Sequence, residues 1–114
     1  MKLHNKAIGM AALLLLQVVG LPQAIADCKE PPMPAVPDGS TADKQTMLEA
    51  YREMRDYQAR AQSFLDCIDA LKVSEPDVDV EILLERLNAY NRTVENMDIV
   101  SRKVHAELDT FNTR

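Results

Sequence analysis

Three groups of side chains in this 114-residue chain have types and spacings that could do chemistry. The acidic run Asp77-Val78-Asp79-Val80-Glu81 begins like a calcium-binding loop, in which carboxylates alternate with other residues. Such a loop needs a glycine next and a bidentate carboxylate at its twelfth position, whereas this chain has Ile82 and Asn88 there. We therefore interpret the acids as residues of a first helical turn, where the positive end of the helix dipole favours them.

The methionines and a histidine form the second group. Met33, Met47, Met54 and Met97 have soft sulfur atoms that could bind copper. Three of them fall on a helical apolar repeat, where methionine usually fills space in the core. His105 has no cysteine or histidine at ligand spacing. We expect neither a metal site nor a cofactor.

No set of residues has a catalytic spacing. The sequence has no Ser-His-Asp set in a strand-turn context, no glycine-rich phosphate loop and no C-x-x-C motif. Acid pairs such as Glu81 and Glu85 share a helix face, but a slender helical protein offers no cleft that would desolvate them. We expect that the protein is not an enzyme.

The third group is the cysteine pair, whose chemistry depends on the compartment. Residues 1–26 have the three parts of a secretory signal: a basic start, an apolar run over 7–19, and the small-x-small ending Ala24-Ile25-Ala26. The apolar run is shorter than the roughly 20 residues of a membrane span. An uncleaved anchor helix is the alternative. We predict a signal peptide cleaved between Ala26 and Asp27, and an exported bacterial protein that is periplasmic or secreted.

Export places Cys28 and Cys67 where disulfides form, and they are the only cysteines of the chain. Asp27 precedes Cys28, where a lipoprotein signal carries a small uncharged residue, so we expect no lipid on Cys28. The mature chain is one small domain without tryptophan, and such a small core usually needs additional stabilisation, for example by a disulfide. We predict a Cys28–Cys67 disulfide. Free thiols or an intermolecular bridge are the alternatives.

The charge of the chain excludes two classes of partner. Loss of Lys2 and Lys6 with the signal changes the formal net charge from −5 to −7. An acidic chain without a basic patch argues against nucleic acid and against anionic membrane surfaces. After cleavage we also expect no stable membrane span.

Two long helices are needed to position these residues. Ser40-Thr41-Ala42-Asp43 resembles a capping box with Asp in place of Glu, and predicts a helix over 42–72. Its apolar residues repeat every 3.5 positions over four heptads. They are Met47, Met54, Ala61 and Ile68 at position a, and Ala50, Tyr57, Phe64 and Leu71 at position d.

A second helix is predicted over 78–112, because Pro76 is tolerated in a first turn but not inside a helix. Its heptad positions are Val80, Leu87, Val94, Ser101 and Leu108 at a, and Leu83, Tyr90, Met97, Val104 and Phe111 at d. The short connection predicts an antiparallel, coiled-coil-like hairpin over 42–112, an all-α fold. Both helices carry further apolar residues, so the leader, a second copy or a partner should cover part of them.

Three motifs resemble those of a group of small secreted proteobacterial proteins. They are C-x-x-P at Cys28 to Pro31, the segment Pro34-Ala-Val-Pro37-Asp38-Gly39, and Phe64-Leu65-Asp66-Cys67-Ile68. The resemblance covers residues 1–72 and adds nothing on the second helix. It implies a periplasmic or secreted protein of a Gram-negative bacterium with a disulfide, and it implies no activity, because we know of none assigned to that group.

The proline-rich leader, residues 27–41, has a length that suits the disulfide. From Cys28 to Thr41 a polyproline II segment spans about 40 Å. Thr41 to Cys67 along a helix spans about 39 Å. We predict that the leader turns at Asp38-Gly39 and runs back antiparallel along the first helix, so that Met33 and Val36 cover apolar side chains.

Three hypotheses for the function follow. The first is a non-enzymatic adaptor or holdase-like protein that binds another exported protein. The second is a self-assembling structural protein, such as a four-helix homodimer. The third is a metal or small-ligand binder that uses the methionines or the acidic run.

Overall fold

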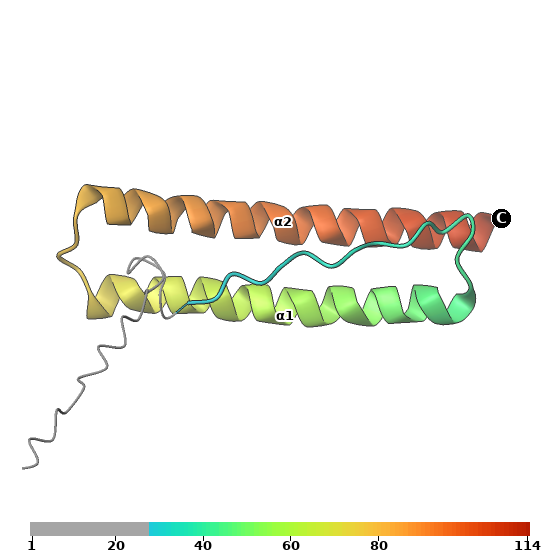
Figure 1. Cartoon of the computed structure of the whole chain (residues 1–114), viewed down its shortest axis with the longest axis horizontal. Helices are drawn as coiled ribbons and strands as arrows, with labels where there is room; N and C mark the ends of the chain where they lie inside the picture. Colours follow the sequence, from blue (N-terminus) through green and yellow to red (C-terminus); the bar gives the residue numbers. More distant parts are fainter. Residues whose placement is uncertain (1–27) are drawn as a thin grey trace, which may run out of the picture.

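The structure is a computed structural model that describes residues 28–114; the predicted signal and its cleavage site between Ala26 and Asp27 lie outside this range. Helix α1 spans Lys44–Ser74 and helix α2 spans Val80–Thr113. The two helices lie antiparallel along their whole length (Figure 1). At about 1.5 Å per residue they are about 46 and 51 Å long. The predicted all-α hairpin is confirmed.

The start of α1 differs from the prediction. Its N-cap is Asp43, whose side chain accepts a hydrogen bond from the Thr46 amide at 2.8 Å. Ser40 instead belongs to the preceding turn, where its amide and hydroxyl donate to Asp38 Oδ1 at 2.9 and 2.7 Å. The capping-box assignment to Ser40 and Thr41 was wrong, because Asp38 already engages these residues in a turn and leaves Asp43 to cap the helix.

The core-facing side of α1 agrees with the predicted heptads. All positions a and d are buried except Leu71, which is half-buried, and Leu65 is buried beside them. Tyr57, Ala61 and Val100 belong to one apolar cluster, and Phe64, Leu65 and Ile68 form another nearer the loop between the helices. The repeat of α1 therefore predicts its buried side correctly.

The buried side of α2 is rotated from the predicted heptads. The buried residues are Arg86, Ala89, Thr93, Val100 and Val104, of which only Val104 is a predicted seam position. Four predicted seam residues stay exposed: Val80, Leu83, Leu87 and Val94, with exposed fractions of 70, 45, 53 and 46%. The predicted register of α2 was therefore wrong for the half of the helix next to the loop.

The size of the side chains explains this rotation. In the half of the hairpin next to the loop, the bulky Phe64, Leu65 and Ile68 of α1 face α2, and the small Ala89 packs against them. Thr93 is buried as well. Its hydroxyl donates a hydrogen bond to the Ala89 carbonyl at 2.9 Å, so this buried polar group is satisfied. A leucine here would need space that the α1 side chains already fill.

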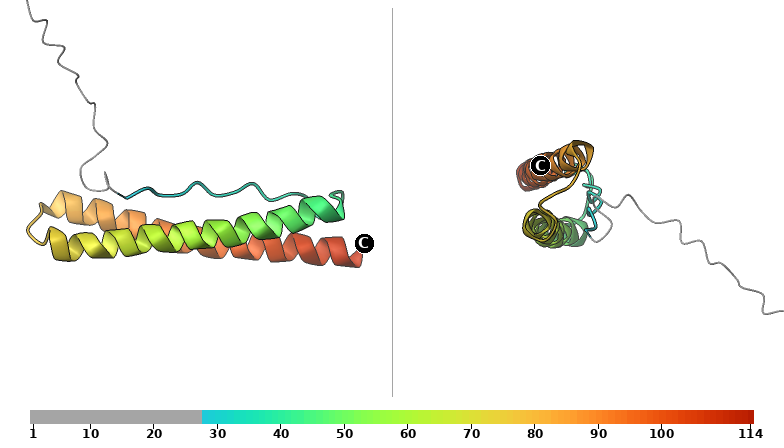
Figure 2. Two further views of the ribbon diagram at one scale, coloured as in Figure 1. Left: turned by 90° about the horizontal axis from the view of Figure 1, so that it is seen from below. Right: turned by 90° about the vertical axis from the view of Figure 1, so that its left-hand side faces the viewer.

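The leader runs back antiparallel to α1 and lies on one face of the hairpin, against both helices (Figures 1 and 2). Val36 packs on the cluster of Met54, Tyr57 and Val104, whereas Met33 stays 47% exposed. The turn at Asp38 is present as predicted: the Ala42 amide donates to the Asp38 carbonyl at 2.9 Å. Prolines suit this segment because they have no backbone N–H group, and the backbone of a neighbouring helix has no free carbonyl group to accept a hydrogen bond from one.

Candidate interaction surface

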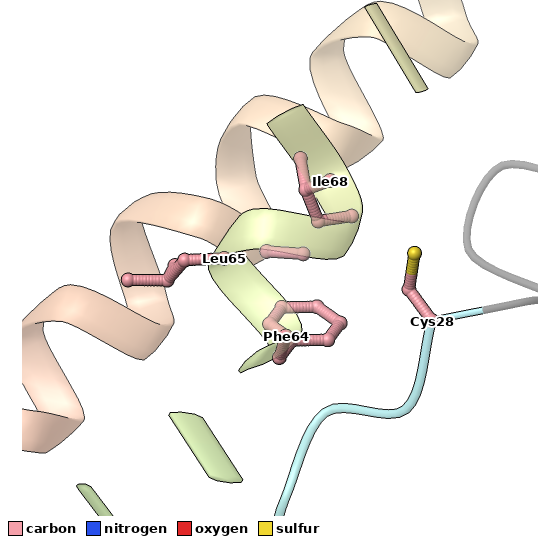
Figure 3. Close-up of a cluster of buried hydrophobic side chains, with 5 residues drawn as sticks. Cys28, Phe64, Leu65 and Ile68 are labelled. Atoms are coloured by element: carbon pink, nitrogen blue, oxygen red, sulfur yellow. The ribbon is translucent and has the colours of Figure 1, made fainter. Parts of the chain in front are cut away.

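The disulfide joins the start of the leader to α1. Cys28 and Cys67 are bonded, with their Cα atoms 5.7 Å apart. Cys28 is buried and belongs to the cluster of Phe64, Leu65 and Ile68, beside which it lies (Figure 3). The predicted bridge is confirmed, and the sulfur atoms also act as part of the apolar core.

An ion pair joins the leader to α2. Arg92 Nε and Nη2 donate to the two carboxylate oxygens of Glu30 at 2.8 and 2.7 Å. The hydrogen bonds from Arg92 hold the pKa of Glu30 below its ordinary value, although partial burial of the carboxyl opposes them. This two-point contact fixes the leader across the groove between the helices.

The turn at the end of the leader also contacts α2. The Gly39 amide donates to Glu107 Oε2 at 2.6 Å, and Arg114 Nη1 donates to the Gly39 carbonyl at 3.4 Å. Gly39 is buried against the backbone of α2, and a Cβ at this position would overlap the Glu107 carbonyl oxygen. Cys28, Glu30 and Gly39 therefore hold the leader along this face of the hairpin.

The opposite side of α2 is open. We call Val80, Leu83, Leu87 and Val94 the α2 stripe. Lys103, which lies beside the leader, is roughly 160° from Leu83 around the helix axis at about 100° per residue. The leader therefore cannot cover the α2 stripe from its position on the hairpin.

A hollow of about 250 Å³ lies at the centre of the α2 stripe, between the two helices. Leu83, Leu87 and Tyr90 line it from α2, and Ile68 and Lys72 line it from α1. The Lys72 ammonium lies 5.8 Å from the centre of the Tyr90 ring. The hollow is large enough to receive one bulky apolar side chain of a partner.

Arg86 also lines this hollow and is only 4% exposed. Its Nη2 donates to Glu75 Oε2 at 3.2 Å, which joins α2 to the loop between the helices. The sequence did not predict this buried arginine, because a charged residue in an amphipathic helix is expected to be exposed to solvent.

The methionines and the histidine considered for metal binding do not lie together in one site. Met47 and Met54 are buried in the α1 core, whereas Met33 lies in the leader. The exposed His105 has its Nδ1 at 2.7 Å from the Ser101 carbonyl oxygen. Within residues 28–114, no three His, Cys, Asp or Glu side chains lie close enough together to hold a metal ion.

The contacts from the leader to α2 were missed by sequence reasoning. The length of the leader matches the distance along α1 to Cys67, and this match placed the leader along α1. Glu30 and Arg92, however, are 62 positions apart, and no spacing rule connects them. The Asp38-Gly39 pair predicted a turn without indicating that Gly39 would touch Glu107. Contacts between distant segments need the three-dimensional placement of α2.

Within residues 28–114, neither helix is long and apolar enough to cross a membrane. Comparison of the chain with protein-family models, with curated proteins and with solved structures gives no match. The resemblance of the leader and α1 motifs to small secreted proteobacterial proteins therefore stays a prediction.

Proposed function

We propose that this protein is an exported, non-enzymatic interaction protein that binds another exported protein through the α2 stripe. One observation carries the proposal: the α2 stripe consists of leucine and valine residues in a heptad pattern, and these side chains are 45–70% exposed. Contiguous exposed apolar surface of this kind is typical of a protein-binding site.

Export is supported by two independent features. Residues 1–26 have the composition of a secretory signal that would be cleaved between Ala26 and Asp27. The Cys28–Cys67 disulfide is a bond that persists in the periplasm or outside the cell. We propose the periplasm of a Gram-negative bacterium, or the medium around it, as the place where the protein acts.

Self-assembly is the second candidate, because the heptad spacing of the α2 stripe is also that of a coiled-coil seam. Two hairpins joined through their α2 stripes would form a four-helix bundle. Light scattering of the mature protein at high micromolar concentration separates the candidates, since a strict monomer excludes this one.

Photocrosslinking in the exporting cell tests the proposed function. A photoreactive amino acid at Leu87 lies on the α2 stripe, and the same group at the exposed Arg52 of α1 is the matched control. We expect one discrete adduct with a different protein at position 87 and none at position 52. The proposal fails if both positions give the same products. A product of twice the mass of the chain would establish self-assembly in its place.

A further inference from the structure

The charge of the hairpin is unevenly distributed. We call residues 66–98 the acidic tip, because they hold nine carboxylates and three bases, a formal charge of −6. The remaining described residues, 28–65 and 99–114, hold eight carboxylates and eight bases. All of the net charge of the described chain therefore lies in the half of the hairpin that carries the α2 stripe, although Glu85 is roughly 160° from Leu83 around the helix axis at about 100° per residue.

The bases of the acidic tip are already engaged. Lys72 pairs with Asp69 at 3.2 Å, Arg86 pairs with Glu75 at 3.2 Å, and Arg92 binds Glu30 in the leader. Within residues 28–114, six carboxylates of the tip form no salt bridge. They are Asp66, which accepts a hydrogen bond from Gln62, and Asp77, Asp79, Glu81, Glu85 and Glu95.

The stability of α2 explains only part of this excess. Asp79 is the N-cap of α2 and Glu81 lies in its first turn, where the helix dipole favours a negative charge. Glu95 lies four turns further along the helix, beyond the reach of the dipole. Asp77 precedes the N-cap of α2 and so lies outside the first turn in which we predicted it. Neither Asp77 nor Glu85 forms a salt bridge within residues 28–114, so these three carboxylates leave the tip with an excess of negative charge.

The α2 stripe has the dimensions of a helix-binding surface. From Val80 to Val94 it is about 21 Å long, which corresponds to a partner helix of about 14 residues. The hollow between Leu83, Leu87 and Tyr90 offers a place for an anchoring side chain at the centre of the stripe. Apolar residues spaced three and four apart on a helix would meet this surface.

We propose that the partner segment is a basic amphipathic α-helix, which places its apolar face on the α2 stripe and its Lys and Arg side chains beside the acidic tip. This inference rests on the proposed function and names the chemistry of its partner. A second copy of this chain is a poor occupant, because joining two α2 stripes brings two tips of charge −6 together. An anionic membrane surface would be repelled for the same reason.

Binding of two designed peptides to the mature, oxidised protein tests the proposal. Both peptides have 16 residues with leucines at helical i, i+3, i+4, i+7 spacing; the other positions are lysine in one peptide and glutamate in the second. Fluorescence anisotropy should show at least about tenfold tighter binding of the lysine peptide, and weaker binding as salt screens the charges.

Two kinds of variant locate the binding site. Leu87→Gln should weaken binding of the lysine peptide at least about tenfold, whereas the matched Leu48→Gln, whose side chain is 41% exposed on α1, should leave it unchanged. The double variant Glu95→Gln and Asp98→Asn, at two carboxylates that flank Val94 on the helix surface, should reduce both the affinity and its salt dependence. Circular dichroism melting curves establish that each variant is folded.

Equal binding of both peptides, or an unchanged affinity of Leu87→Gln, would overturn the proposal. So would binding of anionic vesicles but not of the lysine peptide, or a homodimer that excludes the peptide. If a heterologous adduct at position 87 is found while the lysine peptide does not bind, the proposed function stands and only the basic helix is excluded.

Discussion

At the scale of the residue, Gly39 is needed for the space that it leaves free. Its backbone does not have a positive φ, so its conformation is open to other residues. The requirement comes from the Glu107 backbone, on which the turn of the leader rests. The Asp38-Gly39 pair is therefore both a turn and a contact with the last turns of α2.

We predict that Gly39→Ala destabilises the protein by about 1–3 kcal/mol, because the leader must move away from α2 to admit the methyl group. Urea unfolding followed by circular dichroism measures this change. Thr41→Ala, an exposed position in the same turn, is the control and should stay within about 0.5 kcal/mol of the parent. Equal unfolding midpoints for the parent and Gly39→Ala would mean that the turn does not rest on α2.

The Glu30–Arg92 pair makes a pH-dependent contribution to stability. Since hydrogen bonds from Arg92 lower the pKa of Glu30 in the folded state, the stabilisation is present above the ordinary glutamate pKa of about 4.3. It is lost as the pH falls through the lowered pKa. Half of the Arg92 side chain is exposed, so we expect a contribution of only about 0.5 kcal/mol.

Glu30→Gln should therefore lower the Tm by about 2–4 °C at pH 7, and the difference from the parent should narrow toward pH 2. Differential scanning calorimetry of both proteins across this range measures the effect. All other carboxyls are common to the two proteins, so their titration cancels in the difference. A Tm difference that is constant with pH would contradict a charged contact.

At the scale of the element, the two helices and the buried side of α1 were predictable, because α1 has a single repeat of apolar residues and this repeat is the side that it buries. The register of α2 was not. Its heptads describe an apolar stripe, but α1 packs on the flank that carries Ala89 and Thr93. A heptad pattern indicates which residues are apolar, and the sizes of the facing side chains decide which of them are buried.

Two substitutions in α2 separate these registers. Ala89→Leu should destabilise the protein by about 1–3 kcal/mol, because it adds volume opposite Phe64 and Ile68. Leu87→Ala should change the stability by less than about 0.5 kcal/mol, since that side chain is 53% exposed. Urea unfolding of both variants gives the comparison. The predicted heptads require the opposite order, so a larger loss for Leu87→Ala would restore them.

At the scale of the whole molecule, the hairpin has two unlike sides. The leader runs along one side and contributes Val36 and Cys28 to the two apolar clusters. The α2 stripe stays open on the other side and lies within the acidic tip. The leader was predictable from its cysteine and its length, whereas its choice of groove was not, because that choice depends on Arg92 and Glu107 of α2.

The disulfide makes the leader a permanent part of this architecture. It closes a loop across a sequence separation of 39 residues, for which the chain-entropy model gives about 4 kcal/mol. A domain of this size has a total stability of about 5–15 kcal/mol, so the bridge is a large fraction of it. Replacing Cys28 and Cys67 by serine should therefore lower the Tm strongly and release the leader from the groove.

Limited proteolysis with a broad-specificity protease, followed by mass spectrometry, measures that release. In the double serine variant we expect early cleavage within residues 29–37, before any cleavage in α1 or α2, because Val36 and Pro31 lose their packing when the bridge is absent. The oxidised parent should resist cleavage there, and the parent treated with a reductant should resemble the variant. If all three proteins give the same cleavage pattern, the Glu30–Arg92 and Gly39–Glu107 contacts hold the leader without the disulfide.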